Sequence, residues 1–283
     1  MAQTTEFHIP ITLDMATQKV SLILADASGL SQQQIKHAMQ HGAVWLESNI
    51  GTRRIRRANS RLHAGNRLHF YYAPEVLKLV PPTPQLIADE QEYSVWHKPT
   101  GMLCQGSKWS DHCTINRWIE TQHLFEQQPQ RNSFIVHRLD KAARGLVLIA
   151  HTKKATQKLA GLFEQKKIEK HYRIIVEGEF PEEEQIIDSK IDGKPAHSIA
   201  RRLFFDAHKQ HSLLDVQIKT GRKHQIRIHM QRSGHPVIGD RLHGNAHDRS
   251  PDLQLQSFSL SFTCPLSEQI KRYSCPNALT LVL

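Results

Sequence analysis

The chain has 283 residues, enough for one large domain or two of unequal size. Its mean hydropathy of −0.49 and its lack of any apolar run of about 18 residues exclude a helical membrane protein, and the N-terminus lacks the basic and apolar stretches of a signal peptide, so we expect a cytoplasmic protein. Lys and Arg outnumber Asp and Glu by 37 to 27, which favours a polyanionic partner such as nucleic acid over an ordinary basic enzyme with a solvated surface.

The first 80 residues have the pattern of a small α/β module. Apolar residues recur at helical spacing over 20–27. Ser31 and Gln34 match the capping box of a second helix. Short apolar runs at 44–46 and 67–72 then predict two strands of a hairpin sheet.

Positive charge is concentrated in this module. Six arginines lie within 15 residues that contain no acidic residue: Arg53, Arg54, Arg56, Arg57, Arg61 and Arg67. Because these guanidinium groups repel one another, we expect a partner that neutralises them, and RNA phosphates fit. The alternative is a solvated loop whose counter-charges come from the rest of the chain.

A proline-rich segment at 81–84 predicts a stiff linker between a module at 1–80 and a larger domain at 85–283. Over residues 14–73 the module resembles the small RNA-binding module shared by a small-subunit ribosomal protein and many RNA-modifying enzymes. The resemblance rests on Leu30-Ser31, Ile35, Gly42-Ala43-Val44 and the run 64–68.

The larger domain mixes strands and helices that do not alternate strictly, which favours an α+β fold with a mixed, largely antiparallel sheet and flanking helices. We expect strands at 134–136, 146–150, 172–176, 213–218 and 258–262, and helices at 155–163 and 224–232.

Three segments of this domain carry chemistry-bearing residues: 137–146, 170–178, and 221–229 followed by 234–240. On their own they indicate an acid, a tyrosine and several arginines around a polyanionic substrate. A lone aspartate such as Asp140 is more commonly a helix cap or part of a surface ion pair.

Together these segments resemble the motifs of the pseudouridine synthases that modify large-subunit ribosomal RNA and transfer RNA. The runs His-Arg-Leu-Asp, Lys-x-Tyr and Gly-Arg-x-His-Gln-Ile-Arg occur in the family's order, and 95–101 is similar to its opening motif. The resemblance covers nearly all of 85–283. It implies an isomerase that breaks the bond between ribose and uracil nitrogen and rejoins the base through carbon, with no cofactor.

The resemblance also implies roles for particular residues. Asp140 is the catalytic carboxylate, either as a nucleophile or as a base that leads to a glycal, and Arg227 is the partner that keeps it ionised. Tyr172 stacks on the flipped base, and Arg138 takes the place of that base in the RNA. The basic residues that we expect to bind RNA are Arg138, Arg53, Arg54, Arg56, Arg57, Arg222, Lys223 and His224.

Some positions depart from the family pattern. Ala143-Arg144 stands where the family usually has Thr-Ser, which puts substrate choice and loop geometry in doubt, and His97 and His243 replace an Asn or Asp and a Tyr. Histidines spaced i, i+4 at 37 and 41 and at 243 and 247 lack a third ligand nearby in sequence, so we expect no metal.

The expected function is therefore isomerisation of uridine in structured RNA, with large-subunit ribosomal RNA favoured and a monomer as the default state. A transfer-RNA pseudouridine synthase and a catalytically silent RNA-binding or ribosome-assembly protein remain alternatives. The sequence contains no helix-turn-helix or zinc-finger pattern, which argues against a DNA-binding regulator.

Overall fold

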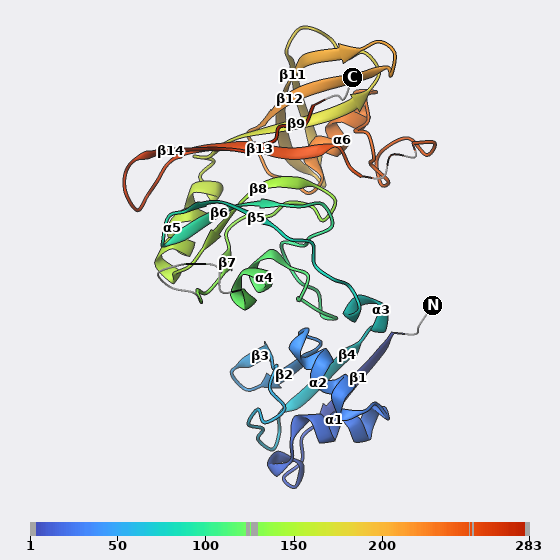
Figure 1. Ribbon diagram of the computed structural model, residues 1–283, viewed down its shortest axis with the longest axis vertical. Coiled ribbons are helices and arrows are strands. Elements are labelled where there is room, and N and C mark those ends of the chain that lie inside the picture. Colours follow the sequence, from blue (N-terminus) through green and yellow to red (C-terminus); the bar gives the residue numbers. More distant parts are fainter. Residues whose placement is uncertain (1–3, 123–124, 126–129, 249, 251, 281–283) are drawn as a thin grey trace. The chain divides into compact units, whose positions relative to one another are not determined.

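The computed structural model describes residues 4–122, 125, 130–248, 250 and 252–280, and the chain forms two compact units (Figure 1). Unit 1 comprises Met1–Pro81 and Gln105–Trp118, and unit 2 comprises Pro82–Cys104 and Ile119–Leu283. The first division falls at the predicted linker, 81–84. Residues 105–118, which the sequence places inside a continuous 85–283 domain, pack in unit 1 instead.

Unit 1 is a four-stranded antiparallel sheet with short helices, and its strand order is β1-β4-β2-β3. Its elements are β1 (Thr5–Pro10), a 3-10 turn (Met15–Thr17), α1 (Val20–Ser28), α2 (Gln32–Gln40), β2 (Val44–Ser48), β3 (Gly51–Arg54), β4 (Arg67–Tyr72) and α3 (Pro74–Leu77). The apolar faces of α1 and α2 form one core with the inward residues of β2 and β4. The helix α4 (Ile115–Thr121) crosses the division at Trp118.

The predicted helices and strands of this module are confirmed. Ser31 accepts a hydrogen bond from the Gln34 backbone N–H, and the Gln34 side chain accepts one from the Ser31 N–H, so both halves of the capping box form. The strands β1 and β3 were not predicted. In β1 only Phe7 and Ile9 pack against the core, and β3 overlaps the start of the arginine run at Arg53 and Arg54.

Unit 2 is built on a larger sheet with the strand order β10-β11-β12-β9-β13-β8-β6-β5; β14 pairs with β13, and β7 with β8. Its elements are β5 (Gln85–Asp89), β6 (Tyr93–Lys98), β7 (Phe134–Ile135), β8 (Arg144–Ala150), α5 (Lys153–Glu164), β9 (Glu169–Glu177), β10 (Gln185–Ile191), β11 (Lys194–Asp206), β12 (His211–Ile218), α6 (Gln225–Arg232), β13 (Leu255–Thr263) and β14 (Ile270–Ser274).

This topology confirms the predicted α+β class with a mixed, largely antiparallel sheet. Among the described strands only β8 and β13 pair in parallel, where Gly145 lies opposite Ser257. A Cβ atom at Gly145 would lie 2.3 Å from the Ser257 carbonyl oxygen, and its φ of +115° suits glycine, so this position requires glycine. The close approach of the two strands fixes the start of β8, directly after the loop that carries Asp140.

The helix α5 covers β6 and β8 and supplies Ala155, Leu159 and Leu162 to their core. The helix α6 follows β12 and contacts β10 and β11. Neither β10 nor β11 was predicted, because both carry polar and charged residues on their outer face. None of the helices in the described part of the chain combines the length and hydrophobicity needed to cross a bilayer.

Candidate active site

The loop between β7 and β8, residues 136–143, presents Asp140 and is held by backbone-directed contacts. The Lys98 side chain is fully buried at the end of β6, and its Nζ donates to the carbonyl oxygens of Met102 at 2.9 Å and Ala143 at 2.6 Å. The Gly101 N–H donates to the carbonyl of Lys141, next to Asp140. Lys98 therefore joins the C-terminal part of this loop to the segment that follows β6, from inside the domain.

His137 anchors the same loop to β8. Burial, with a smaller effect of Lys170, lowers the pKa of His137 to about 3, so its ring is neutral. The neutral Nε2 accepts a hydrogen bond from the Leu148 N–H of β8 at 2.9 Å. The histidine of the His-Arg-Leu-Asp run is thus a structural anchor for the loop.

Arg227 of α6 joins Asp140 to a second carboxylate, Asp240. Its NH1 donates to Asp140 Oδ2 at 3.0 Å, while Nε and NH2 donate to the two oxygens of Asp240 at 2.8 and 2.6 Å. The Arg227 side chain is 5% exposed and that of Asp240 is 1% exposed, whereas Asp140 is 29% exposed. The buried Asp240 therefore fixes the Arg227 guanidinium, whose NH1 donates to the more accessible Asp140 carboxylate.

The charges of this cluster support one another. Burial opposes the charged form of Arg227, but the hydrogen bonds and charges of Asp240 and Asp140 raise the pKa of Arg227 above its ordinary value. Burial likewise opposes the Asp240 carboxylate, and the bonds from Arg227 and from the Leu242 and His243 N–H groups lower the pKa of Asp240. Arg227 and Asp240 are ionised at neutral pH.

The start of α6 is pinned by Gln225, the residue two positions before Arg227. Its side-chain oxygen accepts from the Thr220 hydroxyl at 2.7 Å and from the Arg222 N–H at 3.0 Å, and its amide donates to Ser198 on β11 at 2.9 Å. Gln225 is 3% exposed. Because one side chain ties the turn, the helix and the sheet together, the direction of Arg227 is determined by the fold.

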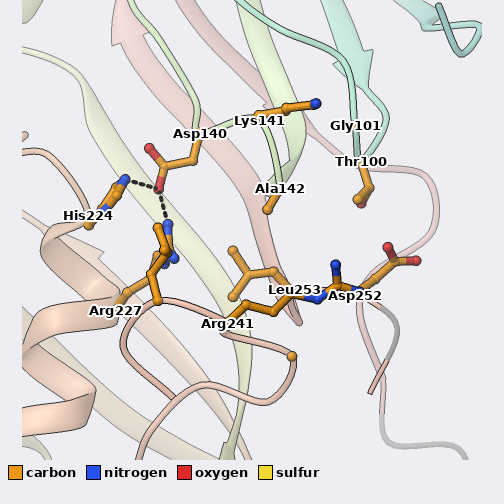
Figure 2. A pocket seen from close by; sticks show the side chains of 12 residues that line it. Thr100, Gly101, Asp140, Lys141, Ala142, His224, Arg227, Arg241, Asp252 and Leu253 are labelled. Atoms are coloured by element: carbon orange, nitrogen blue, oxygen red, sulfur yellow. Dashed lines mark hydrogen bonds and ion pairs between the residues drawn. The ribbon is translucent and has the colours of Figure 1, made fainter. Parts of the chain in front are cut away.

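Asp140 lies where two pockets meet, and Figure 2 shows the larger one with His224 and Arg227 directed at the Asp140 carboxylate. The larger pocket, of about 410 Å³, is within the size range of small-ligand sites. Its walls include Thr100, Gly101, Lys141, Arg241, Asp252 and Leu253. The smaller, of about 110 Å³, includes Arg138, Tyr172, Ile218, Arg222 and Leu255. Asp140, His224 and Arg227 line both pockets.

Tyr172 is the aromatic wall of the smaller pocket. It lies on β9, is 7% exposed, and shares the inward face of that strand with Ile174 and Val176, as its alternation predicted. Burial, with a smaller contribution from the Asp140 charge, raises the pKa of Tyr172 to about 12, against a lowering effect of Ser257. The hydroxyl therefore keeps its proton at neutral pH.

The structure brings most of the residues predicted in unit 2 to this site. Asp140, Arg227, Tyr172, Arg138, Arg222 and His224 all line one or both pockets. Arg222 is also tied to the sheet, because its Nε donates to the Pro195 carbonyl. Lys223 is exposed on the turn before α6 and is not among the residues that line the two pockets.

The arginines predicted to bind RNA in unit 1 fall into two groups. Arg54 NH1 lies 3.1 Å and Arg56 NH2 2.5 Å from Asp111 Oδ2, and the Arg54 guanidinium also stacks over the Trp45 ring. Arg53 and Arg57 are exposed, and neither forms an ion pair with any residue in the described part of the chain. The two groups therefore differ in their surroundings, although they look alike in the sequence; the RNA-binding role expected of them stays a prediction.

Three functional candidates were missed from the sequence. Asp240 lies in the Gly-Asp run but was given no role, Lys98 belonged to the opening motif, and His243 was noted only as a departure. Nothing in spacing alone identifies Asp240, because it pairs with an arginine 13 residues earlier on a different element. For Lys98 the sequence offered only its place in the opening motif, because its burial is seen only in the structure.

The two histidine pairs seen in the sequence are arranged differently. The His37 and His41 rings lie against each other with their centroids 4.0 Å apart, whereas His243 bonds to His224. Within the described ranges no cluster of three or more His, Cys, Asp or Glu side chains is arranged to hold a metal ion.

Comparisons with known proteins identify the larger unit. A family model for RNA pseudouridylate synthase matches residues 92–232. The chain is 28% identical to an uncharacterized RNA pseudouridine synthase of Aquifex aeolicus, over 76% of this chain and 72% of that protein. It is 26% identical to a ribosomal large subunit pseudouridine synthase D of Neisseria meningitidis, over 97% and 80% of the two chains. It is 29% identical to the dual-specificity RNA pseudouridine synthase RluA of Vibrio vulnificus, over 71% and 87%.

A solved structure of the human RNA pseudouridylate synthase domain containing 1 has the same fold. It superposes with a TM-score of 0.58 at 20% identity and covers 70% of this chain and 86% of that one. Asp140, Tyr172 and Arg227 lie within residues 92–232, whereas Asp240 and the strands β13 and β14 follow that range. The chain therefore belongs to the RNA pseudouridylate synthase family, the isomerases that convert uridine to pseudouridine in RNA.

Proposed function

We propose that the protein isomerises a uridine in large-subunit ribosomal RNA and that Asp140 is its catalytic carboxylate. The observation that carries the proposal is the shared fork of Arg227, which is locked by buried Asp240 and presents one N–H to the accessible Asp140. A carboxylate at the junction of two pockets, with a fixed cation on one oxygen, can act on a ribose held in the site.

The reaction breaks the C1′–N1 bond of uridine, turns the base and forms a C1′–C5 bond. The hydrogen on C5 then leaves as a proton, and N1 gains one, so atoms and charge balance without a cofactor. Asp140 either attacks C1′ or removes a proton from C2′ to give a glycal. Both routes need a carboxylate held at the sugar, and the Arg227 N–H that donates to Asp140 Oδ2 at 3.0 Å supports that position.

The target uridine must leave the base stack, at a cost of a few kcal/mol. The ring of Tyr172, on the wall of the smaller pocket, supports a stacking role on the extruded base. Arg138, exposed on the same wall, is suited to fill the vacated position in the RNA. Arg222 and Lys223, in the turn before α6, supply positive charge, and the His224 ring beside them lines both pockets.

Two observations favour ribosomal RNA as the substrate. The similarity to the Neisseria meningitidis protein named for the large ribosomal subunit extends over 97% of this chain, and therefore includes unit 1. Unit 1 also carries the exposed Arg53 and Arg57. Transfer RNA is the second candidate, and we propose a cytoplasmic monomer.

The test measures release of tritium from RNA labelled at C5 of uracil, because rejoining through C5 expels that label. Transcribed large-subunit ribosomal RNA and transfer RNA are compared with wild type and with Asp140→Ala. We expect release by wild type and none by Asp140→Ala, with Glu164→Ala, an exposed carboxylate on α5, as the matched control at wild-type rate. Tight binding of RNA without release by wild type would favour the silent RNA-binding protein.

A further inference from the structure

His224 and His243 form a hydrogen-bonded pair beside Asp140. His224 Nδ1 lies 2.9 Å from His243 Nε2, and His224 Nε2 lies 3.8 Å from Asp140 Oδ2. His224 lines both pockets, and its side chain is 17% exposed (Figure 2). One imidazole donates to the other, so the outer nitrogen of His224 faces the reaction site while its inner nitrogen connects to His243.

The backbone fixes this arrangement. His224 directly precedes α6 and has a φ of +55°, a left-handed conformation in which asparagine, aspartate and histidine are the most common residues after glycine. The His243 N–H donates to Asp240 Oδ1 at 3.0 Å. The histidine pair is thus attached to Asp240, the same buried carboxylate that holds Arg227. Asp140, Arg227, Asp240, His243 and His224 form a closed ring of contacts.

The reaction needs a proton acceptor that Asp140 and Tyr172 do not readily supply. Once the C1′–C5 bond has formed, the proton on C5 must leave and its bonding electrons must return to the ring. The Tyr172 hydroxyl retains its own proton at neutral pH, because burial raises the pKa of Tyr172 to about 12. Asp140 leaves the sugar as the C1′–C5 bond forms, and its Oδ2 then still accepts a hydrogen bond from the cationic Arg227, which makes the carboxylate a weaker proton acceptor.

We propose that His224 accepts the C5 proton and that His243 relays it toward solvent, an inference that rests on the proposed function. The C5–H bond breaks and its electron pair restores the ring. The proton binds His224 Nε2, the Nδ1 proton of His224 passes to His243 Nε2, and His243 releases one to water. N1 of the base gains a proton from solvent, so the step is balanced.

The surroundings of His224 suit a proton acceptor. It faces the Asp140 carboxylate from the loop, Lys223 and Arg227 from its own segment, and His243 from the loop after α6. Burial, opposed by Asp140 and assisted by Arg227, His243 and Lys223, lowers the pKa of His224 below its ordinary value. The ring is therefore neutral at pH 7 and free to accept a proton.

Two substrates separate this step from the earlier ones. Tritium release from C5-labelled RNA reports removal of the C5 proton. Fluorine at C5 cannot leave as a cation, so consumption of RNA that contains 5-fluorouridine reports only glycosidic cleavage and rejoining. We compare His224→Asn, which tolerates the positive φ but accepts no proton, with wild type and with His208→Phe, an exposed histidine remote from the site in sequence.

We measure single-turnover rates at saturating enzyme, which removes any change in RNA affinity. We expect His224→Asn to slow tritium release by about 10²-fold, the usual contribution of a general base, while the saturated rate of 5-fluorouridine RNA consumption stays that of wild type. Deuterium at C5 should then slow the variant more than the wild type. His243→Phe should show a weaker form of the same defect. His243→Tyr, which places a hydroxyl at the relay position, should be faster than His243→Phe.

An equal loss on both substrates would assign His224 a structural role and overturn the inference, as would wild-type tritium release by His224→Asn. The proposed function fails separately. In that case wild type releases no tritium from either RNA, Asp140→Ala is indistinguishable from it, and the inference falls with it.

Discussion

Each unit contains a cluster of aspartate and arginine, and the two clusters are opposite in composition. In unit 2 one guanidinium, Arg227, serves two carboxylates, Asp140 and Asp240. In unit 1 one carboxylate, Asp111, serves two guanidiniums, Arg54 and Arg56. The first cluster has an excess negative charge, and its outer carboxylate is 29% exposed, while the second has an excess positive charge, and Asp111 is 12% exposed.

The difference shows why an Asp–Arg pair alone does not identify an active site. At Asp111 the carboxylate is the shared centre, enclosed by its two arginines and by the backbone near Gly42, where a Cβ atom would lie 2.3 Å from Asp111 Oδ1. Such a group holds segments together. At Asp140 the carboxylate is the outer member, and a buried partner leaves it open to a ligand.

The largest effect is expected from breaking the unit 2 cluster at its centre. Arg227→Met leaves Asp240 buried without its cation, which should cost roughly 3–5 kcal/mol of unfolding free energy. It should also lower tritium release by about 10²–10³-fold, the usual loss when a fixed donor to a reacting group is removed. Urea unfolding and single-turnover release measure the two effects. Arg227→Lys keeps the charge and loses the fork, so its defect should be smaller.

The double variant Arg227→Met with Asp240→Asn separates the two losses. The amide that replaces the Asp240 carboxylate would be neutral and could still accept from the Leu242 and His243 N–H groups, which Asp240 now bonds at 3.0 Å each. Stability should largely return, whereas tritium release should not. Recovery of both would mean that Arg227 acts only through stability, contrary to the role proposed for it at Asp140.

Much of the unit 2 site could be predicted from sequence because its residues lie in ordered local motifs. The loop with Asp140, the strand with Tyr172 and the helix with Arg227 each have a clear local pattern. Asp240, His243 and the contacts of Lys98 could not be predicted, because they depend on which side chains meet across separate elements. In unit 1 the capping box at Ser31 and Gln34 is a local signal and was confirmed.

The arginine cluster of unit 1 also depends on a contact between residues that are distant in the sequence. Its acid-free sequence indicated an external anion, yet the counter-charge for Arg54 and Arg56 is Asp111, which lies 55 residues beyond Arg56 in the chain. No local pattern links a loop at 105–118 to a hairpin at 44–54. For the same reason that segment was assigned to the larger domain.

A smaller effect is expected from breaking the unit 1 cluster at its centre. Asp111→Ala leaves two half-buried arginines facing each other and should lower the stability of unit 1 by roughly 1–3 kcal/mol. Thermal unfolding should show this loss, with Asp26→Ala, an exposed position on α1, as the matched control. Single-turnover tritium release should stay close to wild type. A loss of turnover comparable to that of Arg227→Met would contradict the structural role given to this cluster.

The smallest effect should distinguish the arginines within unit 1. Arg53 and Arg57 are exposed, so Arg53→Gln with Arg57→Gln should leave unfolding unchanged and reduce the slope of log affinity against log salt by roughly 2, about one per phosphate contact. Arg54→Gln with Arg56→Gln, matched in charge, should mainly lower stability because these side chains hold Asp111. Filter binding to ribosomal RNA over a salt series measures both pairs.

Deletion of 1–80 tests this less cleanly, since it would also remove the partners of 105–118. Equal salt slopes for the two double variants would mean that the ion pairs with Asp111 do not decide which arginines meet RNA.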